Sequence, residues 1–218
     1  DRVQARHLQV IVARNLPDLE DEAGALAERL LEEFPDYSRA YITQVESLLH
    51  QDAPTRRIQP LLNAALALPV PPADAFDLQD RLNQRELWYD PATALPLYEK
   101  ALGVDSSRVD LAVTRALRRR AVGETEQALG DLRAVVRQAP RFGQGRHALA
   151  GCLLDLHRHD EALQVMQEGF ELVRHQDWYE PYARRLRAYL FHRAGRRTEA
   201  IAELNTLLEN FRGHSLAA

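Results

Sequence analysis

The residues best suited to chemistry form one short string, His157-Arg158-His159-Asp160. Two imidazoles and a carboxylate can bind a metal ion, but a metal site needs further ligands that converge from elsewhere in the chain. No matching cluster of histidine and aspartate lies nearby in the sequence, and a tight turn between helices carries polar residues in any case. We therefore interpret the string as a solvated turn and expect no metal ion and no other cofactor.

The other candidate for chemistry is the single cysteine, Cys152, which could act as a nucleophile beside His147 or His157. It lies on an apolar helical stripe with Leu149 and Leu153, where cysteine behaves as a small hydrophobic residue. The sequence also lacks a Gly-x-Ser-x-Gly motif, a phosphate-binding glycine loop, a His-Glu-x-x-His motif and a dinucleotide fingerprint. We expect no catalytic residue and predict that the chain is not an enzyme.

The charge of the chain argues against a nucleic-acid partner. Residues 1–109 contain 11 basic and 18 acidic residues, a net charge of −7, and residues 110–218 contain 17 and 14, a net charge of +3. A nucleic-acid-binding protein usually concentrates basic side chains on one surface, and this distribution does not. Every basic residue except Lys100 is arginine, which we attribute to a GC-rich genome rather than to a surface selected to bind carboxylates.

The sequence contains no apolar run of about 18 residues, the length that a membrane helix needs, so we expect no membrane insertion by this segment. It also opens without a signal-peptide pattern. Because the chain starts at Asp1, directly within a helical pattern, we interpret it as a segment of a longer protein. Its missing targeting signals then predict nothing about its location.

The elements that carry these residues repeat along the chain. Ala94, Ala128 and Ala162 recur at a constant sequence step of 34, and the step to Ala200 is 38, which indicates a four-residue insertion near residues 175–178. Further stripe residues follow each alanine at four and seven positions, as on one face of an α-helix. A small residue at the start of this stripe lets two helices approach closely.

We predict an all-α chain, a right-handed superhelical solenoid of about six antiparallel helix pairs. No alternating strand pattern competes with this prediction. The expected units lie near residues 1–37, 38–72, 73–108, 109–142, 143–176 and 181–212. The second unit would place Pro60 where the alanine of the other units lies, and the proline-rich connection that follows it is interpreted as a local bend and not a domain linker.

These motifs resemble the tetratricopeptide-repeat family, whose unit is a 34-residue helix–turn–helix. The small residues of both helices, the turn glycines and one helix-ending proline carry the resemblance: Ala94, Ala116, Ala128, Ala150, Ala162, Ala188, Ala200, Gly123, Gly195 and Pro140. Arg81, Arg115 and Arg187 depart from it, because the family usually has a buried leucine there. Either these helices are rotated, or the arginine stems lie along the core and reach carboxylates, for which Asp77, Asp80 and Glu86 are candidates.

The resemblance implies a non-catalytic scaffold that docks a partner protein or peptide on a concave face. The residues expected on that face are Gln79, Asn83, Glu86, Arg120, His147, Tyr182, Arg185, Tyr189, His192 and Arg193. Tyrosine and arginine are enriched at binding hot spots, so the last unit has the most binding-like face. Trp178 and Tyr179 lie in the adjoining insertion, and for Trp178 binding and packing are both open. Trp88 is expected to pack between repeats.

Two alternatives remain for the partner and the setting. Aromatic side chains beside arginine could stack on sugars, so a carbohydrate-contacting module is a second interpretation of the same face. The arginine bias is similar to that of tetratricopeptide arrays in outer-membrane exopolysaccharide secretion proteins of the Pel and cellulose systems. This weaker resemblance implies a periplasmic scaffold that recruits a polymer-modifying enzyme, and a cytoplasmic assembly scaffold is the alternative.

Overall fold

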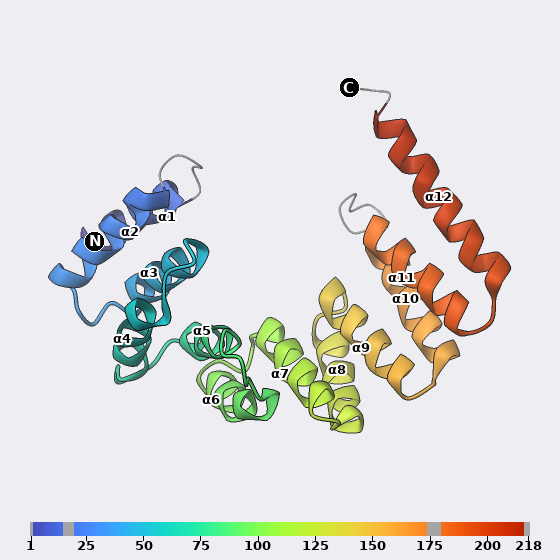
Figure 1. The fold of residues 1–218 in the computed structure, drawn as a ribbon, viewed down its shortest axis with the longest axis horizontal. Coiled ribbons are helices and arrows are strands. Elements are labelled where there is room, and N and C mark those ends of the chain that lie inside the picture. The colour runs from blue at the N-terminus through green and yellow to red at the C-terminus, as the bar shows by residue number, and fades with distance from the viewer. Residues whose placement is uncertain (1, 15–19, 174–179, 216–218) are drawn as a thin grey trace. The chain divides into compact units, whose positions relative to one another are not determined.

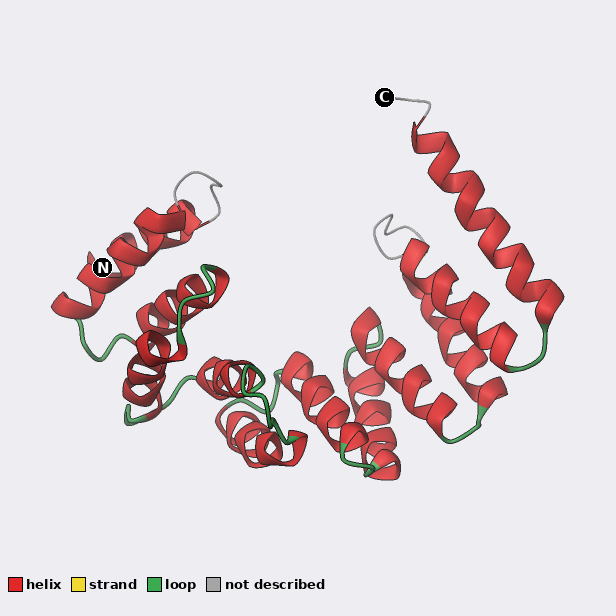
Figure 2. Ribbon diagram, in the orientation of Figure 1, coloured by secondary structure: helices red, strands yellow, loops and turns green. Residues whose placement is uncertain are grey.

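The computed structural model describes residues 2–14, 20–173 and 180–215. All regular elements in these ranges are helices, which confirms the all-α prediction (Figures 1 and 2). In chain order they are α1 (Arg2–Arg14), α2 (Glu20–Glu33), α3 (Ser38–His50), α4 (Thr55–Leu66), α5 (Ala73–Asn83), the 3-10 helix η1 (Pro91–Ala94), α6 (Leu95–Val104), α7 (Val109–Ala121), α8 (Thr125–Gln138), α9 (Gly143–Asp155), α10 (His159–Val173), α11 (Glu180–Arg193) and α12 (Arg197–Ser215).

Consecutive helices pack as antiparallel pairs, α1 with α2 and so on to α11 with α12 (Figure 1). The chain divides into two compact units, Asp1–Arg108 and Val109–Ala218, each with three helix pairs in its described part. Within each unit, the first helix of a pair also packs on the second helix of the pair before it. This stacking of helix pairs is the solenoid arrangement expected from the sequence.

The alanine series marks where paired helices approach closely. Ala94, Ala128 and Ala162 have no exposed surface, and the residues four positions after each of them, Tyr98, Leu132 and Met166, are also fully buried. A larger side chain at the alanine position would force the two helices apart. The prediction that these alanines lie in the core is confirmed.

The alanine position of the second pair is occupied by Ile58 and not by Pro60, so that sequence assignment was wrong. Ile58, Leu62 and Ala65 are buried with the same spacing of four and seven, whereas Pro60 is exposed on α4. The sequence step from Ile58 to Ala94 is 36 and not 34. The extra residues lie between the two stripes, a stretch that includes the proline-rich connection.

The turns of the pairs α7–α8, α9–α10 and α11–α12 each contain one residue with a left-handed backbone. Gly123 has φ +88° and Gly195 has φ +75°, as the turn glycines of the sequence motif predict. His157 occupies the equivalent place, one repeat after Gly123, with φ 58°. A side chain with a Cβ is strained in this conformation, so the turn at His157 forms at a cost in stability.

Two of the three unusual arginines reach carboxylates on the second helix of their own pair. Arg115 Nη2 lies 3.2 Å from Asp131 Oδ2, and Arg187 Nη2 lies 2.8 Å from Glu203 Oε1. The sequence step from arginine to acid is the same in both pairs, and neither partner is among the three acids that we expected. Arg81 is exposed, and its charge acts on Asp77 one turn earlier on α5.

A polar cluster lies beneath the turn that follows α5. Tyr98 of α6 hydrogen-bonds to Asp77 Oδ1 at 2.9 Å and to Asp80 Oδ2 at 2.8 Å, and Tyr89 donates to Asp80 Oδ1 at 2.5 Å. Asp80 is completely buried, so these hydroxyl donors replace the water that its carboxylate gives up. The cluster fixes the chain between α5 and α6.

None of the described helices combines the length with the apolar character that a membrane crossing requires.

Candidate binding groove

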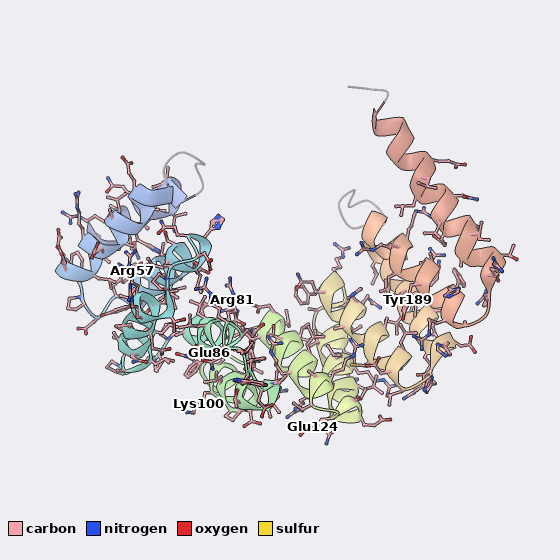
Figure 3. The ribbon with its side chains drawn as sticks, in the orientation of Figure 1. Arg57, Arg81, Glu86, Lys100, Glu124 and Tyr189 are labelled. Carbon is pink, nitrogen blue, oxygen red and sulfur yellow. The ribbon has the colours of Figure 1, made fainter. Side chains whose placement is uncertain are left out.

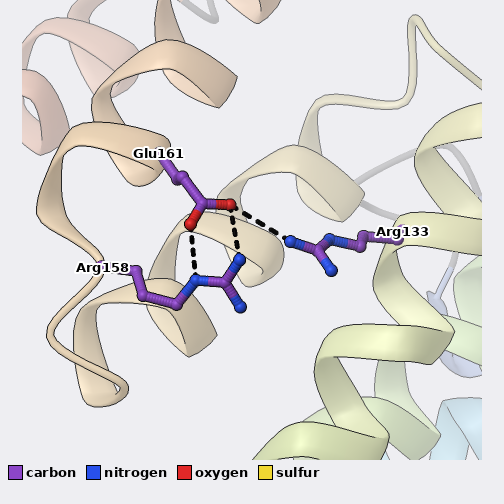
Figure 4. Close-up of polar contacts among 3 residues, drawn as sticks. All are labelled: Arg133, Arg158 and Glu161. Carbon is purple, nitrogen blue, oxygen red and sulfur yellow. Dashed lines mark hydrogen bonds and ion pairs between the residues drawn. The ribbon is translucent and has the colours of Figure 1, made fainter.

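The string His157–Asp160 has a structural role in the turn between α9 and α10. Arg158 donates to Glu161 from Nε at 2.6 Å and from Nη2 at 2.7 Å, and Arg133 of α8 donates to the same carboxylate at 3.2 Å (Figure 4). The hydrogen bonds from Arg158 hold the pKa of Glu161 below its usual range. The three side chains connect the second helices of two consecutive pairs.

The described residues offer no assembled chemical centre. Cys152 is completely buried, and desolvation raises the pKa of its thiol to about 11, so it is protonated at neutral pH and packs as a core residue. Within residues 2–14, 20–173 and 180–215, no group of three or more histidine, cysteine, aspartate or glutamate side chains could hold a metal ion.

Two adjoining hollows lie along α11. The smaller has a volume of about 280 Å³ and is lined by His147 of α9 and by Arg185, Leu186 and Tyr189 of α11. The larger, of about 670 Å³, lies between α11 and α12 and is lined by Arg185, Ala188, Tyr189, His192, Arg197, Ala200, Ile201 and Leu204. Because Arg185 and Tyr189 belong to both hollows, we treat them as one groove, the α11 groove.

Tyr189 of α11, labelled in Figure 3, lines both hollows. Its side chain is 47% exposed. Arg193, one turn later on α11, donates from Nη1 to the Tyr189 hydroxyl at 3.0 Å, and its guanidinium carbon lies 5.9 Å from the ring centroid. This contact restricts the tyrosine side chain while leaving much of it accessible. A restrained, half-exposed aromatic ring is well suited to bind a partner, because little conformational entropy is lost on binding.

The groove is lined by basic and apolar side chains. Arg185, Arg197, His147 and His192 contribute to its walls, and none of the described residues that line it is acidic. The nearby carboxylate of Glu203 is bound by Arg184 and Arg187. Desolvation, with the positive charges of Arg120 and Arg185, lowers the pKa of His147, so this imidazole is neutral at neutral pH.

The charge of Arg120 on α7 acts on His147 of the groove. The Arg120 guanidinium forms a two-point ion pair with Asp155, Nε to Oδ2 at 2.5 Å and Nη2 to Oδ1 at 3.0 Å, and these hydrogen bonds raise the pKa of Arg120. The side chain passes over Gly151, where a Cβ would lie only 2.9 Å from Arg120 Nη1. The glycine therefore leaves room for the arginine between α7 and α9.

The floor of the groove is apolar because the last described helix has an uncovered face. Leu204 follows Ala200 by four positions, which makes it the equivalent of the fully buried Leu132 and Met166, yet it is 44% exposed. Ile201 beside it is also exposed. No helix of the described chain covers this side of α12, so apolar surface that is buried in the earlier pairs is accessible here.

Comparison with known proteins identifies the repeat. Residues 113–169, from α7 to α10, match the family model described as tetratricopeptide repeat. These residues are tetratricopeptide repeats. The other described helix pairs have the same architecture, although the match itself covers only this central part of the chain.

Solved structures with the tetratricopeptide-repeat fold are similar over most of the chain. PilW, a type IV pilus biogenesis factor, is 17% identical, with 96% of this chain and 94% of PilW covered and a TM-score of 0.77. TTC0263 of Thermus thermophilus is 18% identical, with 92% and 99% covered and a TM-score of 0.62. YrrB, a protein with an unusual peptide-binding site, is 15% identical, with 78% and 84% covered and a TM-score of 0.57. No curated protein matches the sequence of the chain.

Only some of the residues that we predicted for the binding face of the second unit lie in the α11 groove. His147, Arg185, Tyr189 and His192 line the groove, with Arg120 and Arg193 beside them. The side chain of Tyr182 and all of Trp178 and Tyr179 lie outside the described residues. Arg197, Ile201 and Leu204 were missed, because we expected the stripe of the last helix to be buried like the others.

The predicted residues of the first unit lie apart from this groove in sequence and have other contacts. Gln79 exchanges hydrogen bonds with Gln59 of α4 at 2.8 and 3.3 Å and donates to Asn83 at 2.8 Å. These amides join α4 to α5. Glu86 was expected on the same helix, but α5 ends at Asn83, so Glu86 lies in the turn that follows (Figure 3).

Proposed function

We propose that this protein is a non-catalytic scaffold that holds a segment of a partner protein, or a peptide, in the α11 groove. The observation that supports this proposal best is the continuity of the groove. Tyr189 and Arg185 connect the smaller hollow beside His147 to the larger hollow over α12, where Arg197 lies beside the aliphatic Ile201 and Leu204. A surface that combines an aromatic side chain, arginines and exposed aliphatic side chains has the composition of a protein-binding site.

The lining of the groove selects the chemistry of the partner segment. Arg185, Arg197 and His192 favour carboxylates, and Ile201 and Leu204 favour apolar side chains. A segment with glutamate or aspartate next to leucine or an aromatic residue would satisfy both the basic and the apolar side chains of the groove. YrrB, which shares the fold, is a tetratricopeptide-repeat protein with an unusual peptide-binding site.

The setting in exopolysaccharide export, in which the scaffold would recruit a polymer-modifying enzyme, stays a prediction from the sequence resemblance. A direct contact with the polymer is the second candidate function, because the exposed ring of Tyr189 beside Arg193 has the composition of a sugar-stacking site. Titration with a soluble anionic or amino-sugar oligosaccharide separates the two. Saturable binding that Tyr189→Ala removes would support the polymer, and no binding would leave a protein partner.

Fluorescence anisotropy with a labelled peptide of glutamate, leucine and tryptophan tests the proposed function. We expect Arg197→Glu to weaken binding by about tenfold, equivalent to about 1.4 kcal/mol, because it places a carboxylate in the groove wall. Arg197 is the first residue of α12, where glutamate is favourable for the helix, so lost binding would not reflect lost folding.

Arg57→Glu is the matched control for this substitution. Arg57 is also exposed and also lies in the first turn of a helix, α4, so the control makes the same change of charge away from the groove. We expect the control to bind the peptide within about twofold of the unmodified chain. Equal loss in both variants would mean that binding follows net charge, and the groove proposal would then be wrong.

A further inference from the structure

Among the described residues of the first unit, the most exposed apolar side chains lie in the connection between α5 and η1. Trp88 is 89% exposed and Leu87 is 86% exposed. The expectation that Trp88 packs between repeats was therefore wrong, and its neighbour Tyr89 is the residue that points into the protein. We call residues 84–90 the Trp88 turn.

The Trp88 turn has a defined backbone. The Tyr89 N–H donates to the Glu86 carbonyl at 3.3 Å, which closes a four-residue turn with Leu87 and Trp88 at its two central positions. On the C-terminal side, the Tyr89 hydroxyl binds the buried carboxylate of Asp80 at 2.5 Å. The two exposed apolar residues are thus carried on a chain segment that is attached to the core.

Arg85 attaches the N-terminal side of the turn to the preceding helix pair. Its Nη1 donates to the Ala53 carbonyl at 2.7 Å, and its Nη2 donates to the Leu49 carbonyl at 3.3 Å and to Asp52 Oδ1 at 2.8 Å. Anchors on both sides reduce the conformational entropy that the turn would lose on binding. Exposed tryptophan on such a support is the side chain most often found at binding hot spots.

The sequence of the turn has the chemistry that the α11 groove selects. Glu86 precedes Leu87 and Trp88, and Asp90 follows them, so one carboxylate lies on each side of the two apolar side chains. Glu86, Leu87, Trp88 and Asp90 are all exposed. The net charges of the two units have the same signs as the turn and the groove. Residues 1–108 contain 11 basic and 18 acidic residues, and residues 109–218 contain 17 basic and 14 acidic residues. Opposite net charges on the two units favour association between copies.

We propose that the Trp88 turn of one copy of this protein docks in the α11 groove of a second copy. Trp88 and Leu87 would cover Ile201 and Leu204, and Glu86 and Asp90 would meet Arg185 and Arg197. This inference rests on the proposed function, since it names an occupant of the same groove. The contact joins two different surfaces, so an assembly always keeps one unused turn at one end and one unused groove at the other, and association can continue.

Sedimentation velocity from about 1 µM to about 1 mM tests the proposal, because weak to moderate interfaces dissociate in this range. We expect the unmodified chain to associate as its concentration rises. Trp88→Ala and Ile201→Glu should each weaken association by at least about tenfold, since each removes one of the two surfaces. Val70→Ala, which shortens another exposed apolar side chain of the first unit, is the matched control and should not change association.

Mixing the two variants gives the sharpest result. The Ile201→Glu chain retains a Trp88 turn, and the Trp88→Ala chain retains a groove, so the mixture should form heterodimers and nothing larger. Far-ultraviolet circular dichroism of each variant checks that its helices are intact. An unmodified chain that stays monomeric, variants that associate like the unmodified chain, or a mixture that stays monomeric would each overturn the proposal. Binding of the Trp88 turn to vesicles of phosphatidylcholine and phosphatidylglycerol in place of self-association would overturn it as well.

The acidic peptide distinguishes this failure from failure of the proposed function. Measured on the Trp88→Ala chain, peptide binding reports on the groove without competition from a second copy. If the peptide binds while the unmodified chain stays monomeric, the groove has another occupant and only the second-copy inference is lost. If neither occurs, both proposals are wrong.

Discussion

The ion pair between Arg115 and Asp131 can be tested with a substitution that the chain already contains at the equivalent positions of the next repeat. One repeat later, the equivalent positions carry Leu149 and Val165. Leu149 is buried and Val165 packs against the same core cluster. The apolar pair therefore fits between the two helices of the next pair, α9 and α10, and the double substitution Arg115→Leu with Asp131→Val transplants it to α7 and α8.

The magnitudes follow from burial. Asp131 Oδ2 accepts from Arg119 Nη1 at 2.7 Å and lies 3.2 Å from Arg115 Nη2, and these side chains are only 18–22% exposed. Asp131→Val leaves two arginines without this acid, which we expect to destabilise the protein by about 2 kcal/mol, less than a fully buried pair would lose. Arg115→Leu keeps the Arg119 contact and removes a buried Nε that has no hydrogen-bond partner, so it should cost at most about 1 kcal/mol.

The double variant should lie within about 1 kcal/mol of the unmodified chain, because well-packed apolar residues replace a partly buried ion pair at little cost. Arg119 also retains Glu124, whose carboxylate lies 3.8 Å away. The two substitutions are therefore expected to compensate each other by about 1 to 2 kcal/mol.

Urea unfolding followed by circular dichroism gives the stabilities of the four chains. At a slope of about 2 kcal/mol per molar urea, Asp131→Val should lower the midpoint by about 1 M. Hydrogen exchange of the α7 and α8 amides localises the effect, because repeats can open separately. Additive losses in the double variant would refute the reasoning. The same cycle at Arg187 and Glu203 should give the same sign.

Three further predictions concern the turn and two titrating groups. His157→Gly should raise stability by about 0.5 to 1 kcal/mol in thermal unfolding, because glycine adopts the positive φ without strain; a loss would contradict this. Desolvation raises the pKa of Asp77, so the folded state binds a proton at this carboxyl more tightly than the unfolded state does. Stability therefore falls as pH rises through the pKa of Asp77 in the folded state. Asp77→Asn should lack this fall in a pH series of melting temperatures, and an unchanged slope would be evidence against it. Desolvation lowers the pKa of His147, so stability should fall as pH decreases below about 6.5, and His147→Gln should reduce that loss.

The fold could be predicted where the sequence repeats itself without interruption. Ala94, Ala128 and Ala162 predict how the two helices of each pair pack. The small alanine marks the point of close approach, and the apolar residues that follow it at four and seven positions mark the buried face of the helix. Ile58 could not be assigned from the same step, since the two extra residues of the second unit shift its register.

The ion-pair partners of the arginines could not be predicted, because a sequence repeat does not give the distances between side chains on different helices. Asp131 and Glu203 lie across a turn from Arg115 and Arg187, and only the packing of the pair shows that they meet. The exposure of Trp88 was equally hidden, because tryptophan is apolar and usually packs. The buried hydroxyl contact of Tyr89 decides which of the two neighbouring aromatics points inward.

Binding of the acidic, apolar peptide to the chain with Tyr189→Ala tests the central claim most directly. Tyr189 joins the two hollows and is half exposed, so its truncation removes contact surface without opening the core. Anisotropy should report saturable binding to the unmodified chain and a loss of about tenfold or more in the variant, the effect of a hot-spot side chain. Equal affinity of the two chains, or no binding by either, would contradict the α11 groove as the docking site of this scaffold.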